Sequence, residues 1–267
     1  MQHNINLNYK TLEKYCAASI PKIFKQSGGK IRGKPGAQHV FLDNGAHILT
    51  VVHADTVQKF QGLTATAING IENIFCSTLD DRLGIYTALE ILPQLGILTD
   101  ILITENEEKA ASTAKDFIPE KNYNWILGLD RSGKDVVTYD YDWPINTLKS
   151  FFKVNYGTFS DICCLDHLEC LGFNLGIGYH DEHSSRAYMI VPEYLENLRR
   201  LTDFYTKNSE IRYQHIPSPY TGTWDWNWDR EYWCKECIDK VWEEETIIEE
   251  GIRICITCGK PVEFCPQ

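Results

Sequence analysis

Five polar residues spaced along the chain have side chains that bind divalent metal ions. They are His53, Asp80, Glu108, Asp130 and His183. Two such ions held about 3.5 to 4 Å apart require one carboxylate between them, plus a nitrogen and a carboxylate on each side. The five residues supply this inventory, and they therefore predict a hydrolase with two metal ions.

Each of these motifs also has an ordinary structural explanation when it is taken alone. Asp80-Asp81 could open a helix, because carboxylates stabilise a helix amino terminus. Glu107-Glu108 could lie in a solvated turn. Asp55 favours the metal interpretation, since a ligating histidine normally donates its other ring N–H to a carboxylate. Asp55 follows His53 by two positions and is placed to accept that bond, directly or from the next shell of residues.

The predicted secondary structure places the candidate ligands at one edge of a sheet. Apolar runs predict strands at 47–52, 98–103 and 125–129, which precede His53, Glu108 and Asp130. Open α/β sheets bind ligands beyond the carboxyl ends of their strands. Helical patterns at 82–92, 160–170 and 193–205 alternate with the strands. The sequence therefore predicts an α/β fold with a mostly parallel sheet flanked by helices. A hairpin is also expected, with strand 39–42 joined to 47–52 by the turn Asp43-Asn44-Gly45.

The ordered series of motifs resembles the co-catalytic di-zinc exopeptidases, a superfamily of aminopeptidases, carboxypeptidases and aminoacylases. The series comprises His53-x-Asp55, Asp80-x-Arg82-x-Gly84, Glu107-Glu108, Asp130 and the run 178–183, and the resemblance covers residues from about 45 to 205. It implies two divalent metals, with zinc expected: one bound by His53 and Asp130, the other by Glu108 and His183, and Asp80 between them. It also implies that Glu107 is the general base and that the peptide bond after Asp80 is cis.

The resemblance leaves three choices open. His180 rivals His183 as the last ligand, although the tail Glu182-His183-Ser184-Ser185 resembles the family pattern. His180 would then lie beside the substrate or pack on Tyr179. The family commonly has glycines after the glutamate pair, whereas this chain has Lys109 to Ala114, so the substrate pocket is expected to be reshaped or the activity reduced.

The third choice concerns the reaction itself. The expected function is an aminopeptidase that hydrolyses N-terminal peptide bonds through a hydroxide bridging the metals. The alternatives are an N-acyl amino-acid deacylase or carboxypeptidase with the same metals, or a catalytically silent metal-binding protein. A free amino terminus would be recognised by an acidic side chain, for which Asp181, Glu182 and Glu105 are candidates.

Two Cys-x-x-Cys pairs near the carboxyl end predict a second kind of metal site. The thiols are those of Cys234, Cys237, Cys255 and Cys258. This spacing is typical of one structural zinc ion in tetrahedral thiolate coordination, and it resembles a zinc ribbon. We therefore predict a catalytic domain over 1–215, an aromatic and proline-rich linker over 216–230, and a zinc-ribbon-like module over 231–267.

Charge and composition limit the classes of partner. The formal net charge is −11, which opposes nucleic-acid binding because phosphates require clustered Lys and Arg. Residues 231–267 contain nine acidic and four basic residues, so the ribbon is expected to contact protein or to self-associate. No apolar run reaches the length of a membrane span, and the start of the chain lacks the basic and apolar regions of a signal peptide. Paired and scattered cysteines fit reduced thiols, and we expect a cytoplasmic protein.

Overall fold

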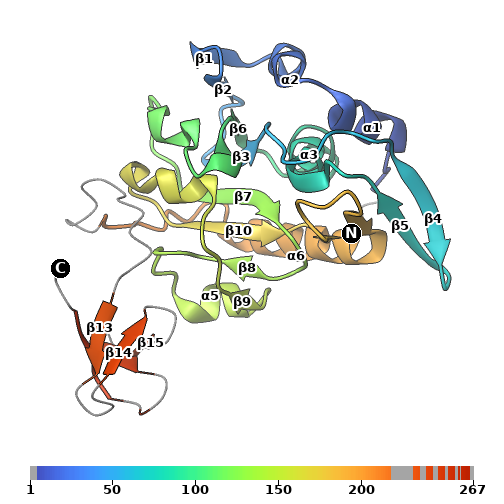
Figure 1. Ribbon diagram of the computed structural model, residues 1–267. Helices are drawn as coiled ribbons and strands as arrows, with labels where there is room; N and C mark the ends of the chain where they lie inside the picture. Colours follow the sequence, from blue (N-terminus) through green and yellow to red (C-terminus); the bar gives the residue numbers. More distant parts are fainter. Residues whose placement is uncertain are drawn as a thin grey trace. The chain divides into compact units, whose positions relative to one another are not determined.

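A computed structural model describes residues 5–217 and, nearer the carboxyl end, 231–234, 239–242, 246–249, 252–255, 258 and 260–264. The chain divides into two compact units, Met1–Pro217 and Ser218–Gln267. The first unit is built around an eight-stranded sheet with the order β1-β2-β6-β3-β7-β10-β8-β9 (Figure 1).

The strands of this sheet are β1 (Lys30–Lys34), β2 (Ala37–Leu42), β3 (Ile48–His53), β6 (Asp100–Thr104), β7 (Trp125–Arg131), β8 (Val136–Val137), β9 (Val154–Asn155) and β10 (Gly172–Gly176). A second, antiparallel sheet contains β4 (Thr64–Ile68), β5 (Ile71–Phe75), β11 (Tyr179–His180) and β12 (Tyr188–Ile190). The helices are α1 (Tyr9–Ala17), α2 (Ile20–Ser27), α3 (Leu79–Tyr86), the π-helical η1 (Thr87–Ile91), α4 (Leu92–Gln94), α5 (Ile145–Lys149) and α6 (Val191–Asn208). Short 3-10 turns are η2 (Glu107–Lys109), η3 (Thr113–Asp116), η4 (Asp161–Cys164) and η5 (Asp166–Leu168).

Four neighbouring strands, β6, β3, β7 and β10, are parallel and form the centre of the large sheet. All six residues of β3 are buried, as expected for a strand covered on both faces. The register of β3 with its two neighbours aligns the carboxyl ends of these strands, since His53 lies opposite Thr104 of β6 and Val51 lies opposite Gly128 of β7. The structure thus confirms the predicted α/β fold with a large, mostly parallel sheet flanked by helices.

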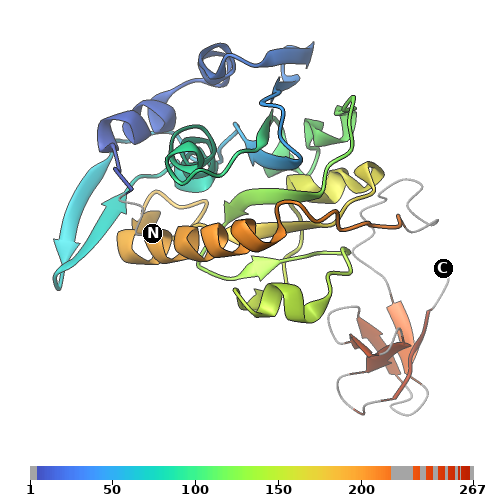
Figure 2. The same ribbon diagram turned by 180° about the vertical axis from the view of Figure 1, so that it is seen from behind.

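Helix α6 covers part of the sheet through an aromatic cluster. The Phe204 ring lies 5.3 Å from the rings of both Trp125 on β7 and Phe173 on β10. The Trp125 indole also donates a 3.0 Å hydrogen bond to the carbonyl of Asn208, at the end of α6. Figure 2 shows this helix lying along the sheet. These contacts fix the strands that carry the candidate ligands, because large buried aromatic side chains dominate core packing.

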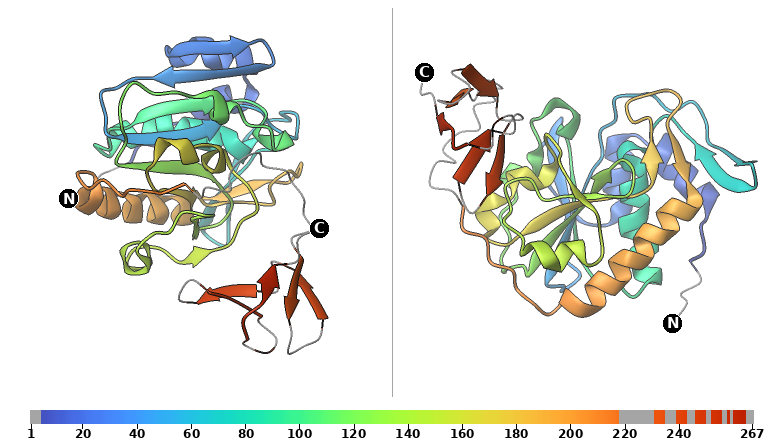
Figure 3. Two further views of the ribbon diagram at one scale, coloured as in Figure 1. Left: turned by 90° about the vertical axis from the view of Figure 1, so that its left-hand side faces the viewer. Right: turned by 90° about the horizontal axis from the view of Figure 1, so that it is seen from below.

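The second sheet positions the last candidate ligand. Its strands β11 and β12 are joined by residues 181–187, a loop that contains His183. Strand β12 pairs with β5, and β5 pairs with the exposed β4 in a hairpin that projects from the body of the unit (Figure 3). The two ends of the loop are therefore set by strands of the small sheet.

Two local predictions were wrong. Strands β2 and β3 do not form a hairpin, because β6 is inserted between them and pairs with both. The turn instead wraps around the start of β6, where the Asp100 carboxylate accepts hydrogen bonds from the Asn44 and Ala46 amides at 2.8 and 3.0 Å. Residues 160–170 form the turns η4 and η5 instead of an α-helix.

The second unit is described only in part. It contains the strands β13 (Glu231–Cys234), β14 (Asp239–Trp242), β15 (Thr246–Glu249), β16 (Ile252–Cys255) and β17 (Glu263–Phe264). Strand β13 pairs with β14 and β17, and β15 pairs with β16, all antiparallel. Among the residues described in both units, no helix has the length and apolar character needed to cross a membrane.

The buried carboxylate of Asp100 yields a stability prediction. Besides the two amides, it accepts a 2.8 Å hydrogen bond from the Tyr123 hydroxyl and forms a 2.6 Å ion pair with Lys121. We expect Asp100→Asn to lower the free energy of unfolding by about 1–3 kcal/mol, because its new NH₂ group meets donors instead of acceptors. Urea denaturation measures the change. The matched control Asp43→Asn alters the exposed partner of the same lysine and should change the free energy of unfolding far less, because solvent screens an exposed ion pair. An equal loss in both variants would contradict this account.

Candidate metal centre

The candidate ligands come together at the carboxyl edge of the parallel strands. His53 ends β3, Asp130 lies near the end of β7, and Glu107 and Glu108 lie in η2, just beyond β6. Asp80 lies at the entry to α3, where its dihedral angles and those of the next residue are not helical. The structure thus gathers side chains that are up to 130 positions apart, from His53 to His183, into one cluster.

One half of the cluster surrounds the His53 ring, which is fully buried. Its Nε2 atom lies 3.1 Å from Asp130 Oδ1, 3.4 Å from Asp80 Oδ1 and 3.8 Å from Glu107 Oε2. Three carboxylate oxygens therefore face a single ring nitrogen. This set of donors could hold a divalent cation, since neutral imidazole and carboxylates are ordinary zinc ligands.

The other half surrounds His183, whose side chain is 54% exposed. Its Nε2 atom lies 2.9 Å from Glu108 Oε2 and 3.1 Å from Asp80 Oδ2. Asp80 therefore directs one oxygen toward each histidine. A carboxylate between two nitrogen ligands is the arrangement that a pair of divalent ions requires.

The orientation of the His53 ring indicates which nitrogen is available as a ligand. Its Nδ1 atom lies 3.0 Å from the main-chain carbonyl of Asp55, which only accepts hydrogen bonds. A proton on Nδ1 leaves the Nε2 lone pair facing the oxygens of Asp130 and Asp80. With a neutral ring and ionised acids this contact is repulsive, so it needs either a metal ion or a proton, on Nε2 or on the facing carboxyl group.

When no metal ion is bound, the crowded acid groups can lose their negative charge only by binding protons, and the pKa values of several groups in the cluster are shifted. Burial, reinforced by Asp130, raises the pKa of Glu107 to about 10. Burial also raises the pKa of Asp130 to about 8, although the His53 imidazole opposes this rise. The hydrogen bond to Asp80 raises the pKa of His183 to about 9. Burial acts to raise the pKa of Asp80 as well, but the two nearby histidines favour its charged form more strongly, so its pKa is lowered.

Two orphaned oxygen atoms show that the cluster fits a metal ion. Asp80 Oδ1 and Glu108 Oε1 are buried without a hydrogen-bond partner among the described residues. Unpartnered buried carboxylate oxygens are costly unless a cation satisfies them. Ligand atoms of His53, Asp80 and Glu108, and likewise of His53, Glu107 and Asp130, lie within 4.8 Å of one another. The chemistry and spacing of the donors therefore suit a divalent metal site.

Asp55 has a wider role than the sequence suggested. Its carboxylate lies 3.5 Å from His53 Nδ1, and the closer partner of this nitrogen is the Asp55 carbonyl. The carboxylate accepts hydrogen bonds from the main-chain amides of Glu107 and Glu108 at 3.3 and 3.2 Å. Asp55 therefore positions the β3 histidine and the glutamate pair together.

Asp81 lies beside the cluster, although the sequence analysis gave it no role in the site. Its fully buried carboxylate accepts hydrogen bonds from the amides of His53 at 3.3 Å and Gly84 at 2.8 Å. A Cβ atom at Gly84 would lie 2.0 Å from Asp81 Oδ1, so glycine is required there. The spacing of Asp80-x-Arg82-x-Gly84 contained this information, since the glycine leaves space for the carboxylate of the intervening residue. The expected cis peptide bond joins Asp80 and Asp81.

The remaining acidic and histidine candidates lie outside the cluster. His180 Nε2 lies 3.0 Å from Glu193 Oε2, and its ring stacks on Tyr188 rather than on the expected Tyr179. Glu105 is buried and accepts a 2.7 Å hydrogen bond from the Gln38 amide. Glu182 accepts a 3.0 Å hydrogen bond from the Ser132 hydroxyl, and Asp181 is exposed. Of the acids suggested for recognition of an amino terminus, Asp181 and Glu182 therefore remain accessible.

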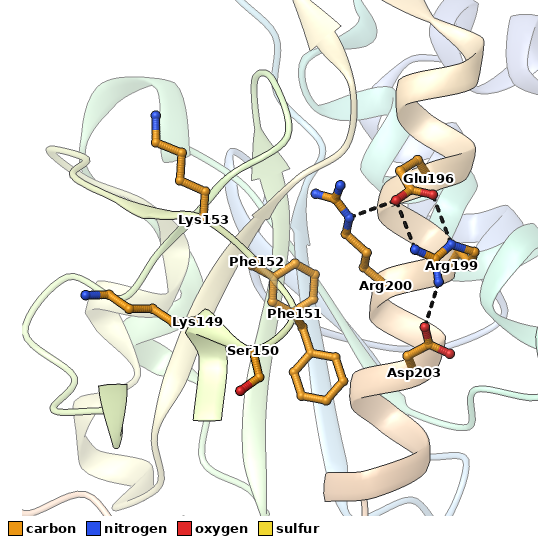
Figure 4. A pocket seen from close by; sticks show the side chains of 9 residues that line it. All are labelled: Lys149, Ser150, Phe151, Phe152, Lys153, Glu196, Arg199, Arg200 and Asp203. Atoms are coloured by element: carbon orange, nitrogen blue, oxygen red, sulfur yellow. Dashed lines mark hydrogen bonds and ion pairs between the residues drawn. The ribbon is translucent and has the colours of Figure 1, made fainter. Parts of the chain in front are cut away.

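A groove of about 450 Å³ lies elsewhere, between the α5 region and α6 (Figure 4). Its basic side chains include Arg199 and Arg200, which form ion pairs with Glu196 one turn away on the same helix. Such exposed ion pairs contribute little to stability. The groove therefore adds no ligand or proton-transfer group to the candidate site.

The predicted cysteine site is described only in part. Cys234 ends β13 and Cys255 ends β16, whereas Cys237 lies outside the described residues. Cys258 is described and partly buried. An isolated antiparallel bridge pairs Ile254 with Pro261, on either side of Cys258 in the sequence. The structural zinc remains a prediction.

Comparisons with known proteins give the fold its context. No protein-family model matches the sequence, and no curated protein sequence matches it. Solved structures with a similar fold include aminopeptidase PepT from Bacillus cereus, with 12% identity over 73% of this chain and 96% of that one, and a TM-score of 0.54. A tripeptidase from Staphylococcus aureus has 9% identity over 75% and 97% of the two chains, with a TM-score of 0.57. A structure described as the dodecamer PhTET1-12s has 12% identity over 74% and 98%, with a TM-score of 0.52. The chain therefore shares the fold of known peptidases.

The geometry of Asp80 leads to a test with metal ions. We expect Mn²⁺ to raise the melting temperature, because an ion present at 100 times its Kd adds about 2.7 kcal/mol to the stability of the folded state. Mn²⁺ is chosen because carboxylates suit it better than thiolates do. Asp80→Asn should abolish the response, whereas His180→Ala should retain it. Differential scanning fluorimetry after treatment with a chelator provides the measurement, and a full response in Asp80→Asn would rule out the bridging position.

Proposed function

We propose that the protein is a di-zinc metallo-exopeptidase, specifically an aminopeptidase. The observation that carries this proposal is the position of Asp80, which directs one carboxylate oxygen to His53 and the other to His183. The peptidase fold of the first unit supports the proposal independently of that contact.

The proposed ligands divide between two ions according to the contacts in the cluster. His53 and Asp130 would hold one ion, and Glu108 and His183 the other, with Asp80 shared. Glu107 is assigned to proton transfer because its nearest oxygen lies 3.8 Å from His53 Nε2, whereas Glu108 lies 2.9 Å from its histidine. When bound, the two ions would lower the pKa of a water molecule and polarise the carbonyl group of the substrate.

The chain's own residues perform the remaining steps. Glu107 takes the proton of the attacking water on a carboxylate oxygen and delivers it to the nitrogen of the leaving amine. Asp55 holds the Glu107 and Glu108 amides, so it fixes both carboxylates relative to His53. Burial raises the pKa of Glu107 when no ion is bound, and two bound cations would favour the ionised carboxylate that can accept this proton.

We also propose one structural zinc ion in the second unit, held by Cys234, Cys237, Cys255 and Cys258. The antiparallel pairs β13–β14 and β15–β16 support it, since each cysteine pair follows a strand that belongs to one of them. Thiolate coordination would contribute most of the folding free energy of so short a module. Its acidic composition favours a protein contact or self-association.

The two neighbouring glutamates provide a test of the reaction chemistry. We expect Glu107→Gln to reduce turnover by a factor of about 100 to 10,000 while both ions remain bound, because only the proton-transfer group is lost. The matched variant Glu108→Gln should weaken metal binding instead. Steady-state kinetics and elemental analysis of the same samples separate the two effects. Normal turnover in Glu107→Gln would remove its role as the base.

Substrate choice distinguishes aminopeptidase activity from the alternatives. We expect zinc-loaded protein to release single residues from peptides with a free amino terminus and to spare N-acetylated copies. The physical reason is that an acidic side chain, such as Asp181 or Glu182, gains a charge-assisted hydrogen bond only from a free ammonium group. Mass spectrometry of matched peptides, together with N-acyl amino acids, measures this choice. Preferential hydrolysis of N-acyl amino acids would indicate a deacylase, and no hydrolysis with metal bound would indicate a binding protein.

A further inference from the structure

The loop that carries the glutamate pair needs anchors, because its backbone conformation is unusual. Glu107 and Glu108 lie in the short turn η2, between Asn106 and Ala110. Both flanking residues have left-handed dihedral angles, with φ values of 66° and 52°. Such conformations in residues other than glycine cost on the order of 1 kcal/mol or more and persist only when the surroundings hold them.

Contacts within the loop close its neck. The Glu105 amide donates to the Thr113 hydroxyl at 3.0 Å, and the Thr113 amide donates to the Glu105 carbonyl at 3.0 Å. At the tip, Asp55 accepts the amides of Glu107 and Glu108. These bonds define the shape of the loop. Its neck is attached to β2 by Gln38, whose amide donates a 2.7 Å hydrogen bond to the Glu105 carboxylate and whose carbonyl accepts a 2.9 Å hydrogen bond from the Thr113 hydroxyl.

A second carboxylate attaches both ends of the loop to the body of the unit. Asp161 is 1% exposed and accepts a 2.7 Å hydrogen bond on Oδ2 from the Thr104 hydroxyl, directly before the loop. Its Oδ1 accepts a hydrogen bond from the Ser112 hydroxyl, near the end of the loop. Thr104 and Ser112 are both fully buried. Two hydroxyl groups that donate to different oxygens match a carboxylate, since only one of the two polar atoms of an amide can accept a hydrogen bond.

The far side of this contact is fixed as well. Asp161 begins the turn η4, which packs against β3, β7 and β10, the strands that carry or adjoin His53 and Asp130. The Ser112 hydroxyl also accepts a 2.9 Å hydrogen bond from the Ala114 amide, so it links Asp161 to the next turn, η3. The loop with the glutamate pair is thereby tied to the same strands as the other half of the cluster.

From this geometry we propose that Asp161 is a positioning residue, which acts through Ser112 and Thr104 to hold Glu107 and Glu108 at the distance from His53, Asp80 and His183 that the reaction requires. The proposal rests on the proposed function. It also gives a role to Ser112, which lies in the segment where the chain departs from the glycine pattern of similar exopeptidases.

Metal titration tests the proposal on Asp161→Ala and Ser112→Ala. Calorimetry with Mn²⁺ on protein freed of metal should show weakening of only one of the two binding steps, the one assigned to Glu108 and His183, by a factor of about 10 to 100. Asp161→Asn keeps one acceptor oxygen and should restore part of the loss. The control Asp100→Asn removes a buried carboxylate at the other end of β6, and it should lower stability without changing the ratio of the two affinities. Equal weakening of both steps, or unchanged affinities, would overturn the proposal.

Two further measurements separate this proposal from the function on which it rests. Hydrogen exchange of residues 105–112 in the metal-free protein should be faster in Asp161→Ala and unchanged in Asp100→Asn, whether or not the protein cleaves peptides. The double variant Ser112→Ala/Asp161→Ala should lose no more affinity than Asp161→Ala, because the two residues share one contact. Additive losses, or unchanged exchange, would show that Asp161 does not act on the loop. Absence of peptide hydrolysis in the unaltered protein would instead contradict the proposed aminopeptidase.

Discussion

The structure concentrates negative charge at one edge of its central sheet, and the arrangement of the surrounding residues depends on this concentration. Asp80, Asp81, Glu107, Glu108 and Asp130 converge there around two histidines. Burial removes solvent from these carboxylates, and the remaining negative charges repel one another strongly at such distances. Both effects favour the protonated form and raise the pKa values of Glu107 and Asp130. The cluster therefore requires cations. The rest of the fold must offset the free-energy cost of bringing these acids together.

The fold offsets that cost with rigid elements and fixed donors. The ligands at the ends of β3 and β7 inherit their positions from a fully buried parallel sheet, which is closed by the aromatic packing of α6. Main-chain amides then stabilise the carboxylates of Asp81 and Asp55. Asp81 accepts two of them and Asp55 accepts two more. Charge-assisted bonds of this kind are stronger than neutral ones, so the negative groups are held in place before any ion binds.

The parts of the fold that follow from local chemistry were predictable, and those that depend on distant pairing were not. His53 and Asp130 end buried strands with clear apolar runs, so their convergence could be inferred. The hairpin at Asp43-Asn44-Gly45 could not be corrected from sequence, because nothing local shows that β6, about 55 residues later, enters between the two strands. Residues 160–170 have helix-like composition, yet the buried Asp161 is held by hydroxyl groups from another part of the chain. Its role is set by those contacts and leaves no periodic pattern.

The two halves of the cluster differ in what holds them, and this difference has consequences for substrate choice. His53 is fully buried and belongs to a central strand, whereas His183 is 54% exposed and lies in the loop 181–187. Glu108 also lies in a loop, between left-handed residues. Loops accept sequence change more readily than buried strands do, and residues that contact ligands are often found on them. The half built on β3 and β7 therefore suits metal-binding residues whose positions must stay fixed. The half built on residues 105–112 and 181–187 can tolerate changes of sequence and shape. In the proposed aminopeptidase, these two loops would accordingly set the selectivity for the substrate. Asp161 fastens the first loop to the body of the unit, and the Gln58 side chain holds the second by donating a 2.8 Å hydrogen bond to the His183 carbonyl.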